Sequence, residues 1–374
     1  MRETGVYQVL GDLQYFVPHP LPPSNPPLTL TPDLMQKYGE ASFALGQLNG
    51  LSVPNVQRFI KAYVVKEALL SSEIEGIHTT LIEVFTQPLG QAVISKDTQL
   101  VLNYSKALEA ALQLMQCDGL PLVSRVLLRA HEVLMSAGES EKSSPGQLRR
   151  QSVRVGAHVP PPAPELARLM SDLERYMNEP SDMSPLIRAG LAHVQFEIIH
   201  PFLDGNGRIG RLLIVLMLMD GGLLTTPILY PSYYFKKYQM DYYRSLDRVR
   251  THGDFEGWLA YYLCAIRDSA QDAYRRAIAI EILERDLKTK ISAMPDFQGI
   301  QQTALGVLDA LFAQPITTVS MMSHALGKSY NTVHRVLVQF VALGIVLETP
   351  VKRNKRYHFT AYLDLLEKEF HEIK

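Results

Sequence analysis

Apolar residues recur every three or four positions through most of this chain, which is the spacing of helices that bury one face. The first such run begins near Pro32, and Gly50 ends it. A second run covers Val56–Ile74 and stops near Gly76, a residue type that commonly ends helices. Further runs predict helices over about 97–117, 121–136, 165–178, 184–199, 231–251, 254–270 and 271–290.

Three segments depart from this pattern. Residues 17–32 carry seven prolines, which fix φ and remove N–H donors, so we expect an extended arm over the surface. Polar and apolar residues alternate over Gln151–Gly156, just before Pro160–Pro162, which predicts a short strand or hairpin. Leu212–Met219 is apolar throughout, which predicts a central buried helix that ends at Gly221.

A change of composition near Ala293–Gly299 predicts a domain boundary. Beyond it lie three helical segments and two strand-like ones, at Thr303–Phe312, Val319–Leu326, Tyr330–Leu343, Ile345–Glu348 and Tyr357–Thr360. Three helices followed by a two-stranded hairpin are typical of a winged helix. We therefore expect a Pro-rich arm and helix over 1–50, a helical domain over 51–290 that includes the helix of about 56–76, and a winged-helix-like domain over 297–374.

Composition places the chain among ordinary globular proteins. Its 374 residues are 47% hydrophobic and 20% charged, and the formal net charge of −1 makes no global case for nucleic-acid or membrane binding. Two cysteines cannot frame a disulfide scaffold, which favours a reducing compartment. The start has no signal-peptide pattern, and no apolar stretch is long enough to span a bilayer. We expect a cytoplasmic protein without membrane contact.

The twelve residues of His200–Arg211, HPFLDGNGRIGR, gather more catalytic side-chain types than any other stretch. The Gly205–Gly207 run lets backbone N–H groups approach an anion closely, at the N-terminus of a helix expected to start near Arg208. Arg208 and Arg211 are three apart and so share a helical face. Two cations at the positive end of a helix repel each other unless carboxylates or a bound anion neutralise them. The segment therefore suits a polyphosphate.

Two side chains beside this loop carry chemistry. His200 precedes Pro201, which disfavours the α region for His200 and places it at the end of the preceding helix. An imidazole there can take a proton near neutral pH, and a core histidine bonded to a carbonyl is the alternative. Asp204 can cap the next helix or hold Mg²⁺ between phosphate oxygens, and the residues alone leave both open.

The whole segment resembles the signature of Fic-domain proteins, His-Pro-Phe-x-Asp/Glu-Gly-Asn-Gly-Arg-x-x-Arg, at every fixed position. The resemblance covers roughly residues 50–275 and implies a mainly α fold, a Fic-type helical bundle with a small β-hairpin flap. It implies AMP transfer from ATP to a Ser, Thr or Tyr hydroxyl of a target protein, and of the chain itself, with release of pyrophosphate. His200 is then the base, and Asp204 holds the Mg²⁺. Nucleotide contacts are assigned to Asp204, Gly205, Asn206, Gly207, Arg208, Ile209, Gly210 and Arg211, the last at the γ-phosphate.

Two flanking segments fit the same resemblance. The flap, which positions the target chain by backbone pairing, corresponds to Val155, Gly156, Ala157 and His158, and a plain surface hairpin is the alternative. Tyr242 and Tyr243 resemble the tyrosine pair that borders the adenine. Aromatic pairs at this spacing more often belong to a core.

Ser71–Gly76, SSEIEG, resembles the family's inhibitory helix, Ser/Thr-x-x-x-Glu-Gly/Asn, with Ser71, Glu75 and Gly76 matching. We expect Glu75 to pair bidentately with Arg211 through the guanidinium fork. The γ-phosphate would then lose its arginine, and ATP would bind in a pose unfit for in-line attack. A solvated charge on a helix is the alternative for a lone glutamate.

The last module has an excess of basic residues. Between 320 and 358 lie Lys328, Arg335, Lys352, Arg353, Lys355 and Arg356, against the single acidic Glu348. The tip 352–356 resembles a basic wing, and residues 328–335 would open a recognition helix that contacts DNA phosphates. Protein contact or dimerisation is an equal alternative, so a homodimer stays open. Two rival functions also remain: Fic-type transfer of phosphate, UMP or phosphocholine, and a DNA-binding regulator with a vestigial Fic core.

Overall fold

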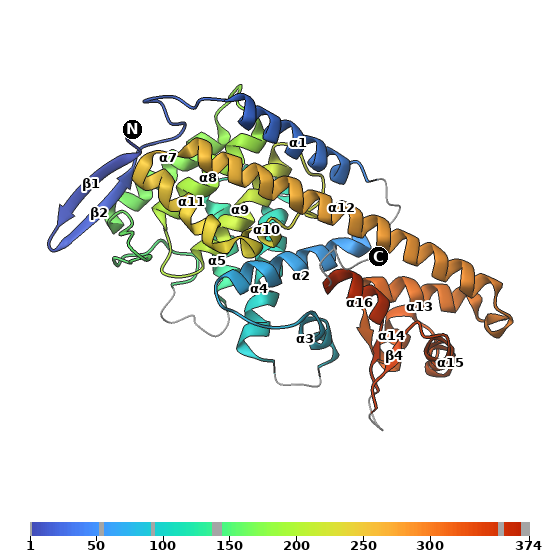
Figure 1. The fold of residues 1–374 in the computed structure, drawn as a ribbon. Coiled ribbons are helices and arrows are strands. Elements are labelled where there is room, and N and C mark those ends of the chain that lie inside the picture. The colour runs from blue at the N-terminus through green and yellow to red at the C-terminus, as the bar shows by residue number, and fades with distance from the viewer. Residues whose placement is uncertain (1, 52–55, 91–93, 137–143, 351–354, 368–374) are drawn as a thin grey trace.

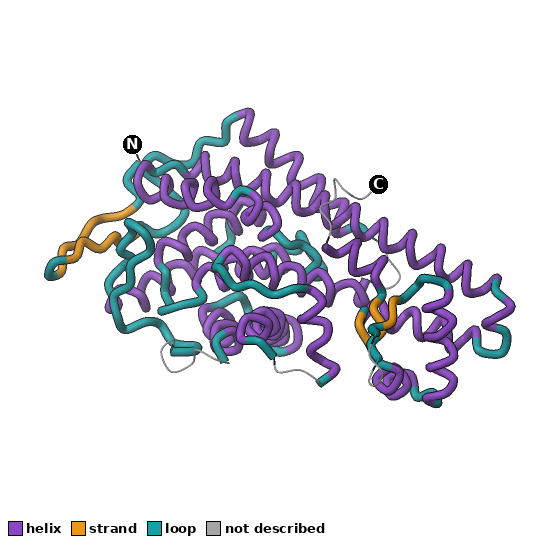
Figure 2. Tube along the Cα trace, turned by 60° about the horizontal axis from the view of Figure 1, so that its bottom comes forward, coloured by secondary structure: helices purple, strands orange, loops and turns teal. Residues whose placement is uncertain are grey.

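A computed structural model describes residues 2–51, 56–90, 94–136, 144–350 and 355–367. The chain is mainly helical, as the apolar spacing predicts (Figure 1). A helical bundle occupies one end and a smaller unit of helices and strands the other, and the long helix α12 (Phe255–Ala293) runs from the first to the second. The strands lie at opposite ends of the molecule (Figure 2).

The bundle is built around α9 (Asn206–Asp220), whose apolar run is buried, as expected. Its partner α8 (Pro185–Ile199) lies against it and ends at His200. The other helices are α1 (Pro32–Asn49), α2 (Val56–Ile74), α3 (Leu81–Thr86), α4 (Lys96–Leu112), α5 (Ser124–Leu134), α7 (Leu166–Asn178), α10 (Ser232–Lys237) and α11 (Gln239–His252). Local chemistry sets their ends: Thr31 caps α1 by accepting from Leu34 N at 3.2 Å. Single turns lie at Gln87–Leu89, Gln113–Cys117, Ala163–Glu165 and Pro295–Phe297.

Three predicted helix boundaries are wrong. The helix expected over 231–251 is two helices, because Tyr238 leaves the helical conformation at φ −119° and ψ 46°. The helices expected over 254–270 and 271–290 are one, since neither glycine nor proline occurs between Trp258 and Ala293 and the apolar positions continue in phase through Ala270, Ala273 and Ala277. The helix expected near Arg208 starts at Asn206.

The N-terminal residues form a hairpin that the apolar pattern did not predict. Strand β1 (Gly5–Leu10) pairs antiparallel with β2 (Leu13–Pro18), from Gly5 opposite Pro18 to Leu10 opposite Leu13. Of the short strand or hairpin expected over 151–156, the structure has a tight turn closed by an isolated antiparallel bridge between Val155 and His158, and no longer strand is described there. The prolines that follow lack the N–H donors needed to extend the pairing.

The C-terminal unit contains the predicted helices and hairpin, with two additions. Its helices are α13 (Gln301–Ala313), α14 (Val319–Leu326), α15 (Tyr330–Ala342) and α16 (Thr360–Glu367), and its sheet has the order β3 (Ile316–Thr317), β5 (Tyr357–His358), β4 (Leu347–Glu348). The additions are β3 and α16. The winged helix stays a prediction, and Lys352 and Arg353 of its expected tip lie outside the described residues. At the base of that tip, Lys355 pairs with Glu348 at 2.9 Å.

Among the described residues, no helix has both the length and the apolar character needed to cross a membrane.

Candidate active site

His200 ends α8 in the left-handed conformation, with φ 49° and ψ 62°. A positive φ is uncommon outside glycine, so other contacts must hold this residue. Its N–H donates to Phe196 O at 2.9 Å, and the buried guanidinium of Arg149 donates from Nε to His200 O at 2.8 Å. Arg149 also donates to Pro161 O at 2.6 Å, so it joins the base of the flap to the end of α8.

The imidazole of His200 is half-buried and lines a cavity of about 490 Å³. Burial lowers the pKa of His200 to about 4, and the neighbouring His158 and Arg149 push that pKa in the same direction. The ring is therefore neutral at pH 7, and it can accept a proton from a group placed in the cavity.

Two side chains fix the loop that follows His200. Asn206 accepts from Phe202 N at 2.8 Å and donates to Phe202 O at 2.9 Å, so its amide closes the loop on itself. The ring of His131 stacks on Phe202 with centroids 3.7 Å apart. Its Nδ1 accepts from Gly146 N at 3.0 Å, so Nε2 carries the proton and donates to Asp204 O at 3.1 Å.

Gly205, at φ 78°, is the N-cap of α9, where the sequence left Asp204 as a candidate cap. The N–H groups of the first turn of a helix have no partner inside it and suit an anion. Asp204 Oδ1 accepts from Gly205 N at 2.6 Å, and Oδ2 lies 3.7 Å from Arg208 Nη2. The Asp204 side chain is 51% exposed, so its carboxylate can still reach a cation brought in by phosphate groups.

Arg211 is buried and already paired. Its Nη2 donates to Glu75 Oε1 at 2.6 Å and to Ser71 O at 2.8 Å, and its Nε donates to Ser71 Oγ at 2.8 Å. The predicted contact with Glu75 therefore forms, but the bidentate geometry is wrong. The guanidinium donates to two residues instead of one, because its Nε donates to Ser71, which lies one helical turn before Glu75.

Glu75 lies against the first turn of α9. Burial pushes the pKa of Glu75 up, but the Arg211 guanidinium outweighs this effect, so the pKa ends below its usual value. A Cβ at Gly207 would stand 2.2 Å from Glu75 Oε1, so only glycine admits this carboxylate. Gly76 follows at φ 77°, which glycine adopts without strain.

The two tyrosines differ in their surroundings. Tyr242 is buried, and its hydroxyl donates to His193 Nε2 at 2.9 Å. His193 Nδ1 in turn donates to Gly210 O at 2.8 Å, so Tyr242 is tied to α9 through a buried histidine. Tyr243 is 45% exposed and lines the cavity. Tyr242 is thus packed like a core residue, which was the alternative to an adenine contact, although it also lines the cavity.

The cavity brings together ten of the predicted residues, Glu75, Val155, Gly156, Ala157, His158, His200, Gly207, Arg211, Tyr242 and Tyr243. The others lie beside it: Ser71 and Gly76 on α2 and at its end, and Asp204, Gly205, Asn206 and Arg208 in the loop and first turn. Ile209 faces the core, and Gly210 lies against Glu197, whose Oε1 would be 2.2 Å from a Cβ there.

The sequence did not predict four residues of the site: His131, Arg149, His193 and Glu197. His131 lies in α5, Arg149 in the segment before the flap, and His193 and Glu197 in α8. Each acts on the site through contacts with residues distant in the sequence, which the spacing of apolar and polar residues does not reveal. Glu197 lines the cavity beside Arg211, and burial raises the pKa of its carboxyl to about 7. For Glu197, the sequence signal was an acidic residue within the otherwise apolar Phe196–Ile199, directly before His200.

Comparisons with known proteins point in one direction. Residues 121–218 match the Fic/DOC family, and residues 35–113 match the Fic/DOC family N-terminal region. A protein adenylyltransferase Fic from Drosophila melanogaster is 28% identical over 274 residues, which are 68% of this chain and 53% of that protein. The protein adenylyltransferase Fic from Drosophila erecta is 35% identical over 137 residues, which are 36% of this chain and 26% of that protein. The chain spans about half the length of the first of these curated relatives.

Solved structures share the fold. A Fic family protein from Desulfovibrio desulfuricans G20 is similar with a TM-score of 0.57 and 25% identity, over 89% of this chain and 98% of its own. Fic-1 from C. elegans is similar with a TM-score of 0.52 and 21% identity, over 67% and 72% of the two chains. The expected fold, a mainly helical bundle, is confirmed.

Proposed function

We propose that this chain, whose residues 35–113 and 121–218 match the Fic/DOC family, is an autoinhibited protein adenylyltransferase. It transfers AMP from ATP to a Ser, Thr or Tyr hydroxyl of a target protein, and to itself. The observation that carries this proposal is a neutral His200 and a cationic Arg211 lining the same cavity. The names of the curated relatives support the reaction class.

The reaction needs one proton acceptor and one leaving group. The target hydroxyl oxygen forms a bond to the α-phosphorus, and the bond from that phosphorus to the oxygen bridging the β-phosphate breaks. Pyrophosphate leaves with the electron pair, and His200 accepts the hydroxyl proton. A neutral imidazole with its backbone locked at the end of α8 suits this role.

ATP fits the donors around the cavity. The N–H groups of the first turn of α9 and the guanidinium of Arg208 would hold the α- and β-phosphates, and Arg211 would hold the γ-phosphate. Tyr243 offers an exposed ring for the adenine. Mg²⁺ would be held by Asp204 together with phosphate oxygens, and when bound it neutralises phosphate charge.

Inhibition follows from the contact between α2 and α9. Glu75 and Ser71 occupy the donors of Arg211 that a γ-phosphate needs. The Glu75 carboxylate also places negative charge beside Gly207, where the phosphates approach. Removal of Glu75 therefore frees the arginine and lowers the repulsion.

Intact-mass analysis tests the reaction class. The Glu75→Gly protein, incubated with ATP and Mg²⁺, should gain the mass of one AMP on itself or on an added lysate protein. A parallel incubation with UTP tests transfer of UMP. A phosphate-sized gain with ATP, or no gain on any protein, would exclude AMP transfer and favour one of the rival functions.

A further inference from the structure

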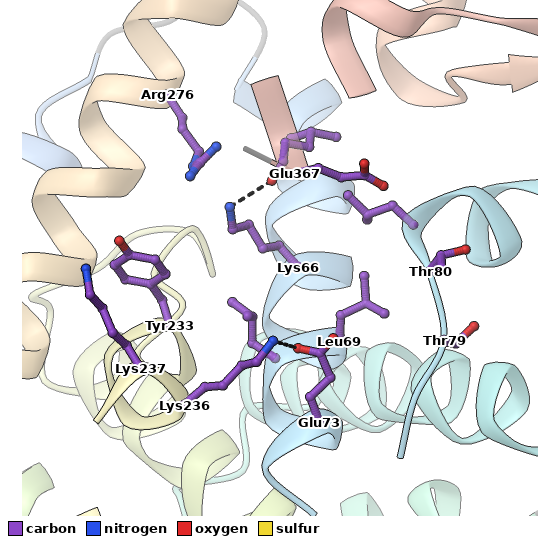
Figure 3. Close-up of a pocket in the computed structure, with 13 residues that line it drawn as sticks. Lys66, Leu69, Glu73, Thr79, Thr80, Tyr233, Lys236, Lys237, Arg276 and Glu367 are labelled. Atoms are coloured by element: carbon purple, nitrogen blue, oxygen red, sulfur yellow. Dashed lines mark hydrogen bonds and ion pairs between the residues drawn. The ribbon is translucent and has the colours of Figure 1, made fainter. Parts of the chain in front are cut away.

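A second cavity, of about 430 Å³, lies between α2, α10, α12 and α16 (Figure 3). It is lined from α2 by Lys66, Leu69, Leu70 and Glu73. With 100° of rotation per residue, these positions lie on the side of α2 opposite Ser71 and Glu75. One face of the proposed inhibitory helix therefore meets Arg211, and the other meets this cavity.

Cations outnumber carboxylates around this cavity. Lys66, Lys236, Lys237 and Arg276 line it, against Glu73 and Glu367. The hydroxyl groups of Thr79, Thr80 and Tyr233 add neutral hydrogen-bonding groups. Four cations, two carboxylates and three hydroxyls around an open volume form a site for a small anion with more than one charged group.

Two of the cations are built into the wall. Lys66 is buried and donates to Leu366 O at 2.8 Å. The fully buried Arg276 donates to Leu365 O and is ion-paired with the buried Asp272, whose Oδ2 lies 2.7 Å from its Nε. Both thus meet the carbonyl end of α16, where cations are favoured. Figure 3 shows Lys66 and Arg276 extending toward each other from α2 and α12. Lys66 gives the site a fixed positive wall, which exposed lysines alone would not, and the ion-paired Arg276 holds the end of α16 beside it.

The segment 236–243 joins the cavity to the inhibitory contact. Lys236 pairs with Glu73 on the last turn of α2. Gln239 Nε2 donates to Ile74 O at 3.0 Å, and the hydroxyl of Tyr243 donates to the same oxygen at 3.4 Å. Glu75 follows Ile74 directly. A ligand that draws Lys236 away from Glu73 therefore weakens what holds the last turn of α2 in place.

We propose that this cavity is an effector site for a small polyanion, a metabolite that carries two or more phosphate or carboxylate groups. Its occupancy competes with Glu73 for Lys236 and loosens the hold of Glu75 on Arg211, which activates the enzyme. The binding half of the proposal stands on the cavity alone. The activating half rests on the proposed adenylyltransferase function.

Calorimetric titration tests binding without reference to activity. Citrate and inorganic phosphate serve as probes of the two anion chemistries, and the wild-type chain should bind one of them. Lys237→Glu reverses an exposed charge at the rim and should weaken binding about tenfold or more. Lys106→Glu makes the same change on the exposed face of α4 and should leave affinity unchanged. The absence of binding heat with both probes, or equal affinity in Lys237→Glu and wild type, would overturn the site.

A second variant guards against an indirect effect. Lys66→Met removes the buried cation while keeping the length of the side chain, and it should also weaken binding about tenfold, with folding checked by circular dichroism. If Lys66→Met is folded and binds as wild type does, the positive wall is not the binding surface.

Self-modification then tests the activating half, with free Mg²⁺ held constant because citrate binds it. The probe that binds should raise AMP transfer by the wild type severalfold and leave the Glu75→Gly protein unchanged. An unchanged wild-type rate at saturating probe would overturn the activation. An inactive Glu75→Gly protein would instead remove the proposed function, while the calorimetric result would still decide the site.

Discussion

At the scale of residues, the backbone holds His200, the proposed base, rigidly at the end of α8. Its N–H donates to Phe196 O and its carbonyl accepts from Arg149, which holds the left-handed conformation. Burial, with a smaller effect of His158 and Arg149, lowers the pKa of His200 and keeps its ring neutral. Pro201 made the helix end predictable from the sequence. The holding contact from Arg149 was not predictable, because it spans 51 residues.

The pKa of His200 gives a pH prediction. Because the free enzyme holds this pKa at about 4, the kcat/KM of the Glu75→Gly protein should fall on the acid side near pH 4, well below the pH 6.5 of an ordinary histidine. A pH profile of AMP transfer measures it. An acid limb at pH 6 to 7 that disappears in the Glu197→Gln variant would assign the limb to Glu197 instead.

Asn206 is predicted to shape the loop through its side chain. Asn206→Asp removes the donor to Phe202 O and places a carboxylate against that carbonyl. We expect the free energy of unfolding to fall by about 1–3 kcal/mol and AMP transfer to fall strongly. Denaturant titration and the transfer assay measure the two effects. A stable variant with full activity would show that the loop does not depend on this amide.

At the scale of elements, most helices follow from apolar spacing and their terminal residues, and α1 and α2 have the predicted bounds. The errors have physical causes. Nothing in the sequence marks the middle of α12 as a break, and β3, with two residues, is too short to show alternation. Strand β1 is mostly exposed and β2 buries the four consecutive residues 15–18, so neither strand alternates between a buried and an exposed face.

Two residues of α2 and its end, Ser71 and Glu75, hold Arg211 of α9. The sequence resemblance included Ser71 in the motif but gave the pairing with Arg211 to Glu75 alone. Ser71→Ala removes the acceptor for Arg211 Nε but leaves Glu75 in place. We expect AMP transfer to rise severalfold, less than in Glu75→Gly. Ser72→Ala is the matched control, because Ser72 Oγ is buried without a hydrogen-bond partner among the described residues. Equal rates for the two alanine variants would show that Ser71 does not help to hold Arg211.

At the scale of the whole molecule, several titratable groups are held in their neutral forms. Burial lowers the pKa of His131, His158 and His200 to about 4 and that of His193 to about 3. Burial raises the pKa of Glu67 and Glu197 to about 7. Between about pH 4.5 and 6.5 the unfolded chain thus gains protons on four histidines, while the folded chain holds extra protons on two carboxyls.

The four histidines outnumber the two carboxyls, so the free energy of unfolding should fall as pH is lowered through this window. The slope is on the order of 1 kcal/mol per pH unit for each proton that is not offset. Glu197→Gln removes one opposing group and should steepen the fall. Denaturant titrations at pH 6.5 and 4.5 measure both proteins. A wild-type chain that gains stability at pH 4.5 would contradict this balance.

We propose that Arg211 serves two partners, Glu75 in the resting chain and a γ-phosphate in the active one. The most direct measurement is the rate of label transfer from ATP labelled at the α-phosphate to the protein itself. We expect a strong rise in rate for Glu75→Gly and none for Glu109→Gly, because Glu109 is an exposed glutamate of α4. We also expect no label transfer when His200→Ala is combined with Glu75→Gly. Equal rates with and without Glu75, or full activity without His200, would contradict the account.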